Sequence, residues 1–387
     1  MQQSNRIPYD VIVAGGGPAG ASAAYFLGQA GLRVLVLEKE NFPRYKACGG
    51  ATSARLLAEF PFSFDSVIEA RIQAVTVAQR GATLTFPLPD RPIHMVMRSE
   101  FDQYLLAHAR AEVRTGSPVQ SVAEQPDRVL VTTRAGDTFT GRYLVGADGP
   151  SSVVARSLGL RRSKTLLGAI EVEAPVSPEV FQRFRDTSWF IFGEIPMGYL
   201  WIFAKAEHLS VGIGALHPRP GELQRVLPAV MARYGISLQG LPQHGHPIPV
   251  YSGREPIATP RALLVGDAAG LVDPLSGEGI RYAVRSGRIA AETILAARPQ
   301  DYQRRIQREI GANFRYALLF SRLLFRYPNL SFKLGSLDPL AAPAFVDLFS
   351  DRSDYAHLLL RLCATLPLFA ARQEVAAVRR LFRSHAP

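Results

Sequence analysis

Two glycine-rich junctions far apart in the sequence constrain the fold of this chain more than any other feature. Each follows an apolar run that predicts a buried strand (residues 9–14 and 262–265), and each precedes a predicted helix. A strand that ends in glycines before a helix presents backbone N–H groups and the positive end of a helix dipole to an anion. Two such sites so far apart in sequence indicate one long, phosphate-bearing cofactor that is held from both.

The first junction has the spacing of a dinucleotide-binding turn. Gly15 would make the tight turn, Gly17 would admit a pyrophosphate, and Gly20 would allow close packing of helix on strand. A helix is expected over residues 21–30, followed by a strand that leads to Glu38, where an acidic side chain would bind a ribose hydroxyl. These features predict a Rossmann-like unit, and the cofactor that it shares with the distant junction is most economically FAD.

The second junction runs over residues 266–280. Its start, Gly266 and Asp267, is expected to face the ribityl and phosphate arm of the cofactor, and its end, residues 277–280, the ring. A helix should follow over residues 282–297.

A third junction lies at residues 143–152, where an apolar strand ends at Asp148 and Gly149 and runs into serines suited to cap a helix. On its own this dipeptide would be a simple turn. Beside the other two junctions it predicts a further cofactor contact.

The composition excludes several classes of protein. The chain has 387 residues, 47% hydrophobic and 20% charged, as expected of a globular protein with one large or two closely joined domains. Its two cysteines argue against a disulfide framework, and its polar N-terminus predicts no signal peptide. No apolar run reaches the roughly 18 residues of a membrane-spanning helix. We therefore expect a cytoplasmic protein.

The net charge of +11 comes almost entirely from arginine. No nucleic-acid-binding motif accompanies the charge, so we predict no nucleic-acid partner. Arginines between residues 304 and 326 lie among Phe and Leu residues. This mixture indicates either a helix packed on the domain or a basic region in peripheral contact with the inner face of a membrane. The sequence leaves both open, and it does not give the oligomeric state.

More specific signals lie in residues 42–50 (FPRYKACGG), 196–203 (PMGYLWIF) and 273–280 (DPLSGEGI). With the three junctions in this order, the chain resembles the FAD monooxygenase superfamily typified by p-hydroxybenzoate hydroxylase. Within that superfamily it most resembles the geranylgeranyl reductase family, over about residues 8–295. The family's aromatic motif ends in a proline where this chain has Ala204, a departure that bears on the substrate pocket rather than on the flavin.

The resemblance implies how the chain would hold FAD. Arg98, which opens a helix expected over residues 99–111, would reach a phosphate or ribose; a surface arginine is the alternative. Val119, at the end of a short strand, would contact adenine through its backbone. The expected FAD-binding residues are Gly15, Gly17, Ala19, Gly20, Glu38, Lys39, Cys48, Gly49, Gly50, Arg98, Val119, Asp148, Gly149, Gly266, Asp267, Gly277, Gly279 and Ile280.

Residues 199–203 predict a strand whose alternate residues face one way. Tyr199, Trp201 and Phe203 would then make a continuous aromatic wall, which suits a long apolar substrate and could stabilise a developing carbocation. The alternative is that this stripe is the core side of a second sheet. We assign these three residues and Pro274 to the substrate, and Tyr199 and Trp201 also to catalysis.

Cys48 is the third residue that we assign to catalysis. It precedes two glycines, which would let the backbone approach a planar ring, in a loop with two basic side chains. The thiol would position substrate or deliver a proton; the alternative is a small side chain packed in a turn. Cys363, in an apolar run, is expected in the core. The histidines lack a metal-binding spacing, so we predict no metal.

The predicted fold is mixed α/β (α+β): a Rossmann-like FAD-binding domain with an inserted antiparallel-sheet substrate domain and a helical C-terminal tail. The FAD-binding domain would be discontinuous, over residues 1–70, 98–165 and 251–297. The substrate domain would comprise residues 71–97 and 166–250. The helical region would span 298–387, with breaks at Pro328, Pro339, Pro343 and Pro367.

The function that the resemblance implies is FAD-dependent reduction of an isoprenoid carbon–carbon double bond. The substrate would be a geranylgeranyl lipid, a chlorophyll or a quinone side chain, and NAD(P)H or another donor would reduce the flavin. A flavin monooxygenase of the same fold is the alternative, because fold alone does not determine function. A halogenase needs a lysine near its substrate and is disfavoured, since no lysine lies between Lys46 and Lys164. A non-enzymatic electron-relay flavoprotein is a further alternative.

Overall fold

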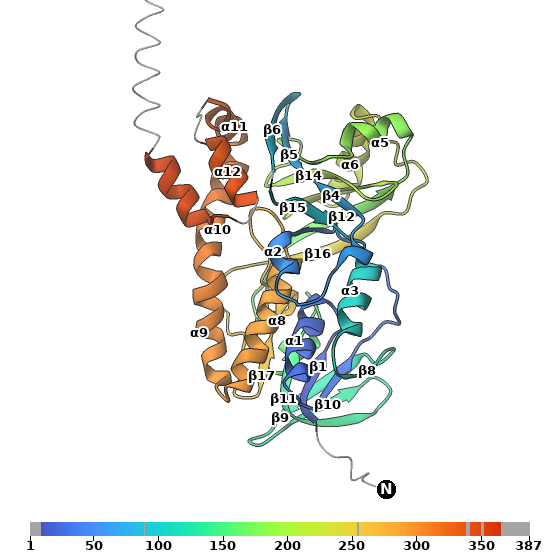
Figure 1. The fold of residues 1–387 in the computed structure, drawn as a ribbon, viewed down its shortest axis with the longest axis vertical. Helices are drawn as coiled ribbons and strands as arrows, with labels where there is room; N and C mark the ends of the chain where they lie inside the picture. Colours follow the sequence, from blue (N-terminus) through green and yellow to red (C-terminus); the bar gives the residue numbers. More distant parts are fainter. Residues whose placement is uncertain (1–8, 89, 254, 338–340, 350–351, 365–387) are drawn as a thin grey trace, which may run out of the picture.

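The computed structural model describes residues 9–88, 90–253, 255–337, 341–349 and 352–364. Figure 1 shows two large sheets towards opposite ends of the molecule, with long helices along one side that lead to the C-terminal helices. The mixed α/β fold with a helical C-terminal region, predicted from the sequence, is confirmed.

The first sheet contains the strands that lead into the glycine junctions. Its parallel strands lie in the order β8 (Glu112–Arg114), β2 (Val34–Leu37), β1 (Tyr9–Ala14), β11 (Thr138–Gly146) and β17 (Ala262–Leu264). The sheet continues from β11 with two antiparallel strands, β10 (Val129–Thr133) and β9 (Val119–Glu124). Because β1 and β17 flank β11, all three predicted junctions leave the same edge of this sheet.

Two helices that follow the junctions pack closely on each other. They are α1 (Pro18–Gln29) and α8 (Ile280–Leu295). Ser22 Oγ of α1 donates a hydrogen bond of 2.9 Å to the Val284 carbonyl of α8. A Cβ at Gly287 would overlap the carbonyl oxygen of Ala19, so the glycine allows this close approach.

The helices begin and end a few residues away from the predicted positions. α1 begins at Pro18 rather than residue 21, because proline suits the first turn of a helix. α8 begins at Ile280, two residues earlier than expected, and α3 (Arg98–Ala107) ends four residues earlier. Two short helices are also present: α4 (Val153–Ser157) follows the third junction, and α7 (Gly266–Ala269) forms the start of the second.

The second sheet has the strand order β16 (His244–Val250), β12 (Thr165–Ala174), β15 (Leu209–Leu216), β14 (Gly198–Ala204), β13 (Thr187–Phe192), β5 (Ala74–Gln79) and β6 (Ala82–Pro87). Its neighbours are antiparallel except β13 and β5, which are parallel. One core packs under this sheet with helices α5 (Pro178–Phe184) and α6 (Glu222–Arg233). The division into domains at the boundaries given above remains a prediction.

A small third sheet lies in the order β3 (Ala51–Ser53), β7 (Ile93–Met95) and β4 (Ala70–Ile72). The short helix α2 (Ala54–Leu57) follows β3, and a 3₁₀ turn (Asp65–Val67) precedes β4. Through β3 this sheet connects the segment at Cys48 with the rest of the fold.

The C-terminal region is helical where it is described. It contains a 3₁₀ turn (Pro299–Asp301), α9 (Tyr302–Ile306), a π-helical turn (Gln307–Gly311), α10 (Ala312–Arg326), α11 (Pro328–Leu337), α12 (Ala341–Phe349) and a helix over residues 355–364. α11 reaches the second sheet, because Gln79 Nε2 of β5 donates to Asn329 Oδ1 at 2.8 Å. Within the described part of the chain, no helix is both long enough and apolar enough to cross a membrane.

Some predictions for this region need correction. Pro328 does start a new helix, but Pro343 lies inside α12, in its first turn, where proline is tolerated. Pro339 and Pro367 lie outside the described residues. The prediction that Cys363 is a core residue is wrong: its side chain is exposed, because the helix that carries it has a solvent-facing side.

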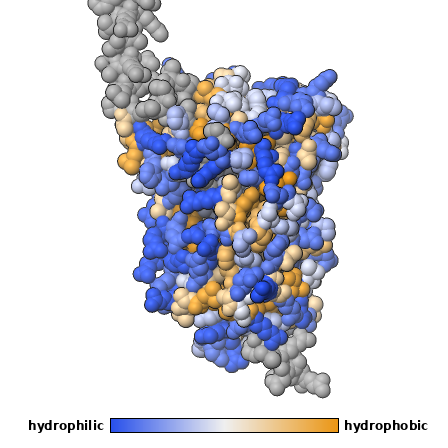
Figure 2. Space-filling model, viewed as in Figure 1, coloured by the Kyte–Doolittle hydropathy of each residue, from blue (hydrophilic) through white to orange (hydrophobic). Residues whose placement is uncertain are grey.

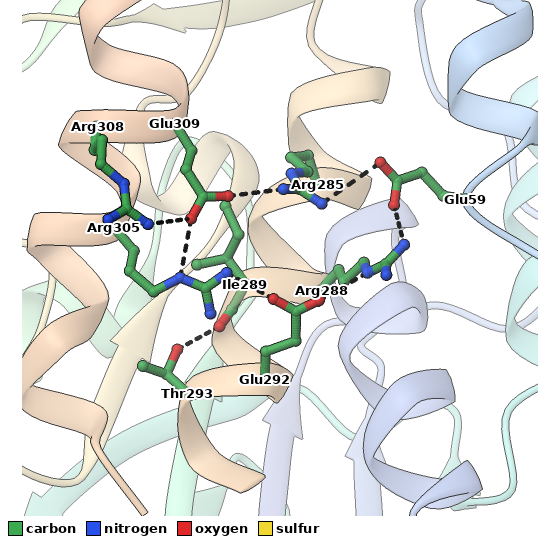
Figure 3. A network of polar contacts seen from close by, with 9 residues as sticks. All are labelled: Glu59, Arg285, Arg288, Ile289, Glu292, Thr293, Arg305, Arg308 and Glu309. Carbon is green, nitrogen blue, oxygen red and sulfur yellow. Dashed lines mark hydrogen bonds and ion pairs between the residues drawn. The ribbon is translucent and has the colours of Figure 1, made fainter. Parts of the chain in front are cut away.

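A closed ring of ion pairs holds α8 against the turn after α2 and against α9 with the π-helical turn (Figure 3). Three glutamates and three arginines alternate around it, with N–O distances from 2.5 to 3.7 Å. In order they are Glu59, Arg288, Glu292, Arg305, Glu309 and Arg285. The ring fixes the start of the C-terminal region to the helix of the second junction.

Candidate active site

One cavity of about 930 Å³ extends from the glycine junctions of the first sheet to the aromatic face of the second. Gly15 and Gly279 line one part of it, Trp201 and Phe190 another, and Phe332 of α11 a third. The cavity therefore joins segments that are widely separated in sequence. An extended cofactor and an apolar substrate could share it.

The first junction supplies a turn that only glycine fits. Gly15 has φ of +103°, and a Cβ there would overlap the carbonyl oxygen of Ala147. Gly17 precedes α1 and has no side chain to cap it, so N–H groups of the first turn remain at the cavity wall. Gly20 does not line the cavity; a Cβ there would overlap the Gly15 carbonyl oxygen, which agrees with its expected packing role.

The Glu38 carboxylate stabilises the glycine turn through a hydrogen bond. Its Oε2 accepts a hydrogen bond of 2.6 Å from the Gly16 N–H, and its Oε1 accepts one of 3.0 Å from the Glu40 N–H. The side chain is buried and lines the cavity next to Lys39. Each carboxylate oxygen retains acceptor capacity for a ribose hydroxyl.

Arg98 is a buried residue, which excludes the surface alternative. Its guanidinium donates two hydrogen bonds of 2.7 Å to Asp102, one turn along α3. Arg44 donates to the same carboxylate at 2.9 Å. Both arginines line the cavity, so Asp102 fixes two positively charged side chains in the cavity wall.

The second junction places a partly exposed carboxylate beside Lys46 and His246. Lys46 Nζ lies 3.4 Å from Asp267 Oδ2, and His246 Nε2 lies 3.8 Å from it. Burial opposes the charge, but Lys46, His246 and Arg98 outweigh it and hold the pKa of Asp267 well below its ordinary value. Asp267 therefore stays ionised in the cavity wall.

The loop before α8 is held from two directions. Tyr199 donates its hydroxyl hydrogen to the Ser276 carbonyl, which ties the aromatic strand to this loop. Tyr355, in the helix over residues 355–364, donates to Asp273 Oδ1 at 3.2 Å. The C-terminal region thus touches the second junction directly.

At the third junction the Asp148 carboxylate accepts hydrogen bonds from the residues that start α4. It accepts from Ser152 Oγ at 2.5 Å and from the N–H groups of Val153 and Val154 at 2.6 and 3.0 Å. Ser152 Oγ in turn accepts from the Ala155 N–H, so the predicted serine cap is confirmed. Asp148 and Gly149 line the cavity, but the carboxylate oxygens mainly serve the start of α4.

Tyr199, Trp201 and Phe203 form the aromatic wall predicted from the strand pattern. Neighbouring ring centroids lie 6.4 and 6.3 Å apart, and all three rings line the cavity. A Cβ at Gly49 would come within 2.8 Å of the Phe203 ring and 3.2 Å of Trp201 Nε1. The segment at Cys48 therefore lies directly against this wall.

Cys48 lines the cavity, and its Sγ accepts a hydrogen bond of 3.4 Å from the Gly50 N–H. Lys205, which follows β14, donates to the Gly49 carbonyl at 2.7 Å and to the Val96 carbonyl at 2.9 Å. Burial lowers the pKa of Lys205. In the sequence, a lysine that directly follows an apolar strand was the signal that could have identified Lys205 as a residue that holds the Gly49 segment.

Most predicted site residues meet in this cavity. Those that line it are Gly15, Gly17, Ala19, Glu38, Lys39, Cys48, Gly49, Gly50, Arg98, Val119, Asp148, Gly149, Asp267, Tyr199, Trp201, Phe203, Gly277, Gly279 and Ile280. Val119 is the first residue of β9. Gly20, Gly266 and Pro274 are not part of the cavity wall.

Sequence reasoning missed the contributions of two other regions. Leu324 and Phe332 of the C-terminal helices line the cavity, as do Tyr45 and Glu171 on its opposite side. The alternation of β12 does show Glu171 facing one way, but no local signal tells which face of that strand meets a cavity.

These features fit FAD. The glycine turn leaves a cradle that a Cβ would fill, the start of α1 suits a pyrophosphate, and Arg44 and Lys46 supply positive charge in the wall. Trp201 Nε1 is buried with no hydrogen-bond partner among the described residues, beside Gly49. A ligand in the cavity would give this donor a partner. No group of three or more His, Cys, Asp or Glu side chains converges as a metal site in the described ranges.

Comparison with known proteins agrees with this site. A family model for the FAD-binding domain matches residues 8–193. A geranylgeranyl diphosphate reductase of Rhodobacter capsulatus is 30% identical over 305 residues, which cover 74% of this chain and 75% of the relative. A menaquinone reductase of Mycolicibacterium smegmatis is 30% identical over 318 residues, which cover 76% of this chain and 78% of the relative.

A solved structure shows the same fold. A geranylgeranyl bacteriochlorophyll reductase-like protein from Thermoplasma acidophilum matches with a TM-score of 0.76 and 24% identity, over 95% of this chain and 98% of that chain. The match extends beyond residue 295, where the resemblance seen in the sequence is weak.

Proposed function

Because the chain belongs to the geranylgeranyl reductase family of FAD-dependent oxidoreductases, we propose that it reduces carbon–carbon double bonds of an isoprenoid chain. The substrate would be a geranylgeranyl lipid or diphosphate, a chlorophyll precursor, or the side chain of a quinone. The relatives named above support these classes by their own substrates.

The observation that carries the proposal is the continuity of the cavity. Beyond the aromatic wall, the cavity continues along apolar side chains of the second sheet and reaches the C-terminal helices. The side chains from the sheet are Val77, Leu84, Phe86, Phe190 and Phe192, and Leu324 comes from α10. An isoprenoid is long and apolar, so such a passage beside the cofactor residues would bury most of its surface.

Bound FAD would supply the hydride, and the protein would supply binding, orientation and exclusion of water. We keep the FAD-binding set expected from the sequence, with Gly20 and Gly266, which do not line the cavity, acting through packing rather than contact. Tyr199, Trp201 and Phe203 would orient the isoprenoid, and their faces favour positive charge that develops on it. Cys48 would lie between flavin and substrate.

NAD(P)H as the electron donor is part of the proposal, as the usual reductant of flavins with this chemistry. The chain would be cytoplasmic and would meet its apolar substrate at the inner face of a membrane. Support comes from α10, which carries an exposed apolar stripe: Tyr316, Leu319, Leu323 and the following Tyr327 are 38 to 54% exposed. Arg315, Arg322 and Arg326 flank this stripe and are exposed too.

The same helix lines the cavity through Leu324, and α11 continues the lining with Pro328 and Phe332. On the face shown in Figure 2, hydrophobic side chains lie at the upper left, among the C-terminal helices, and down the middle. An apolar stripe flanked by arginines suits an anionic bilayer. An isoprenoid could then pass from the lipid along α10 and α11 into the cavity.

Anaerobic turnover tests the proposed reaction. The purified flavoprotein is reduced with NADPH, NADH or dithionite, mixed with geranylgeranyl diphosphate or menaquinone, and followed by flavin absorbance and product mass. We expect flavin reoxidation without oxygen and a product with two more hydrogens per bond reduced. Turnover that needs oxygen and adds an oxygen atom would instead identify a monooxygenase. Turnover of neither kind would favour the electron-relay alternative.

A further inference from the structure

A row of paired residues crosses the second sheet and forms one wall of the cavity. Residues that are paired across neighbouring strands project from the same face of a sheet. In strand order the row is Leu84, Val77, Phe190, Trp201, Gly212, Glu171 and His244. All members except Gly212 line the cavity. The side chains of the row are apolar from Leu84 to Trp201, and those of Glu171 and His244 are ionisable.

Gly212 lets the aromatic wall reach Glu171. A Cβ at Gly212 would overlap Cζ2 of Trp201, so the indole lies over this glycine. Trp201 and Glu171 lie two strands apart, a separation of about 10 Å at the usual strand spacing. Because the indole spans part of that separation, Glu171 borders the space beside the ring that would hold the isoprenoid.

The Glu171 carboxyl is buried and oriented. Glu171 is only 2% exposed. Tyr45 donates its hydroxyl hydrogen to Oε2, and Ser210 Oγ donates to Oε1 at 3.3 Å. The Tyr45 ring lies against His244, with centroids 4.3 Å apart, so the segment at Cys48 and strand β16 both hold this arrangement.

The surroundings of Glu171 favour its protonated form. Burial raises its pKa to about 8; the charge of Glu173 adds to the rise, and the hydrogen bonds from Tyr45 and Ser210 oppose it. The titratable and charged groups that face it are Glu173 on its own strand, Tyr45, Lys205 after β14, His208 before β15, and His244 of β16. The proton is lost only as the pH rises through the raised pKa.

We propose that Glu171 is the acid that protonates the isoprenoid double bond in the reaction proposed above, on which this inference rests. The carboxyl O–H bond breaks, and its proton forms a C–H bond with the electron pair of the double bond. The other carbon would take up the hydride that bound, reduced FAD would supply. The alkene gains two electrons and two hydrogens, the flavin is oxidised, and Glu171 is left as a carboxylate.

Glu173 and His208 offer the carboxylate a route to regain its proton. Glu173 lies two residues further along β12, and its charge is among the causes that raise the pKa of Glu171. His208 Nε2 lies 2.9 Å from Glu173 Oε2, and both side chains are partly exposed. Burial opposes the Glu173 charge, but His208 and Lys205 outweigh it and lower its pKa. An ionised Glu173, which is partly exposed and lies against His208, can therefore take up a proton and pass it to Glu171.

The first test is Glu171→Gln, which keeps the shape of the side chain and removes its acidity. We expect FAD binding and flavin reduction to be retained and double-bond reduction to slow by about 100-fold or more, the contribution of a general acid. Glu179→Gln, at an exposed position of α5, is the matched control and should keep the wild-type rate. A folded Glu171→Gln flavoprotein with the wild-type rate would overturn the proposal.

The second test does not depend on turnover. Infrared spectra of the protein at pH 7 should show the carbonyl stretch of a buried protonated carboxyl, which disappears as the pH rises past 8. Glu171→Gln should lack this band and Glu179→Gln should keep it. A band that is absent from the wild type, or unchanged by Glu171→Gln, would contradict the proposal.

Tyr45→Phe provides a third test that leaves the acid in place. It removes a hydrogen bond that favours the carboxylate, so both the infrared band and the alkaline limit of activity should move to higher pH. A merely structural role for Glu171 would not move this limit. An active wild type whose alkaline limit does not move in Tyr45→Phe would overturn the acid role alone, whereas an inactive wild type would overturn the proposed function with it.

Discussion

At the scale of single residues, Gly212 shows how a missing side chain shapes the cavity. It lies between Trp201 and Glu171 in the register of the second sheet, and the Trp201 indole occupies the place that a side chain would take. The orientation of Trp201 therefore depends on a residue of the neighbouring strand. The aromatic wall belongs to the sheet rather than to β14 alone.

Gly212→Ala should displace the indole. Overpacking of this kind costs about 1–3 kcal/mol, so we expect the free energy of unfolding to fall by that amount and double-bond reduction to slow. Urea unfolding and turnover with the same substrate measure both effects. Gly214→Ala is the matched control on the same strand and face, because a Cβ there would find its nearest neighbour, Ala169 Cβ, at 3.8 Å. Equal losses in the two variants would contradict this account.

At the scale of elements, the ring of ion pairs in Figure 3 connects α8 with α9 and the π-helical turn. Its side chains are 17 to 35% exposed, so solvent screens them only in part. Burial opposes the charge of Glu309, but Arg305 and Arg285 outweigh it and lower its pKa. A carboxylate with a lowered pKa stabilises the fold above its ordinary pKa, and this contribution is lost as the pH falls through the lowered value.

Glu309→Gln should open the ring at two bonds. We expect a loss of about 1 kcal/mol in the free energy of unfolding at pH 7 and low salt. The difference from the wild type should shrink as the pH falls below about 4, where the wild-type carboxylate also takes up a proton. Arg304→Gln is the control, because Arg304 is 79% exposed and pairs with Asp301, outside the ring. A difference that stays constant with pH would show that the ring charges do not stabilise the fold.

The elements also show what the sequence could predict. The glycine junctions, strand β1 and the aromatic wall are local patterns with a fixed spacing, so they could be recognised without the fold. Glu171 becomes part of the cavity only through the register of four strands, and Leu324 only through the packing of α10. The position of Cys363 was predicted wrongly because an apolar run does not tell which side of a helix faces solvent.

At the scale of the whole molecule, the stripe on α10 and the cavity lie on two sides of one helix. Arg322 lies beside exposed Leu319 and Leu323, while Leu324 lines the cavity. Charge would bring the protein to an anionic surface, and the apolar side chains would hold it there. The entrance for a lipid-soluble substrate would then face the lipid.

Vesicle binding tests this contact. The wild type should bind vesicles with anionic lipid and release them at high salt, and Arg322→Gln should weaken binding about fivefold, near 1 kcal/mol. Leu319→Ser combined with Leu323→Ser should weaken it at least about tenfold, through lost apolar burial. Arg219→Gln, an exposed arginine before α6, is the control. Equal binding by all variants would show that α10 does not contact the bilayer.

The place of β17 beside β11 has a consequence for how the protein is made. A ribosome releases the chain from its N-terminus, at roughly 5–20 residues per second, so β11 emerges long before its neighbour β17. Until then the growing chain has the first and third junctions without the second, and an open sheet edge at residues 144–146. We expect the chain to capture flavin only after translation has passed the second junction, so that a yellow nascent chain would mark the completion of its first sheet.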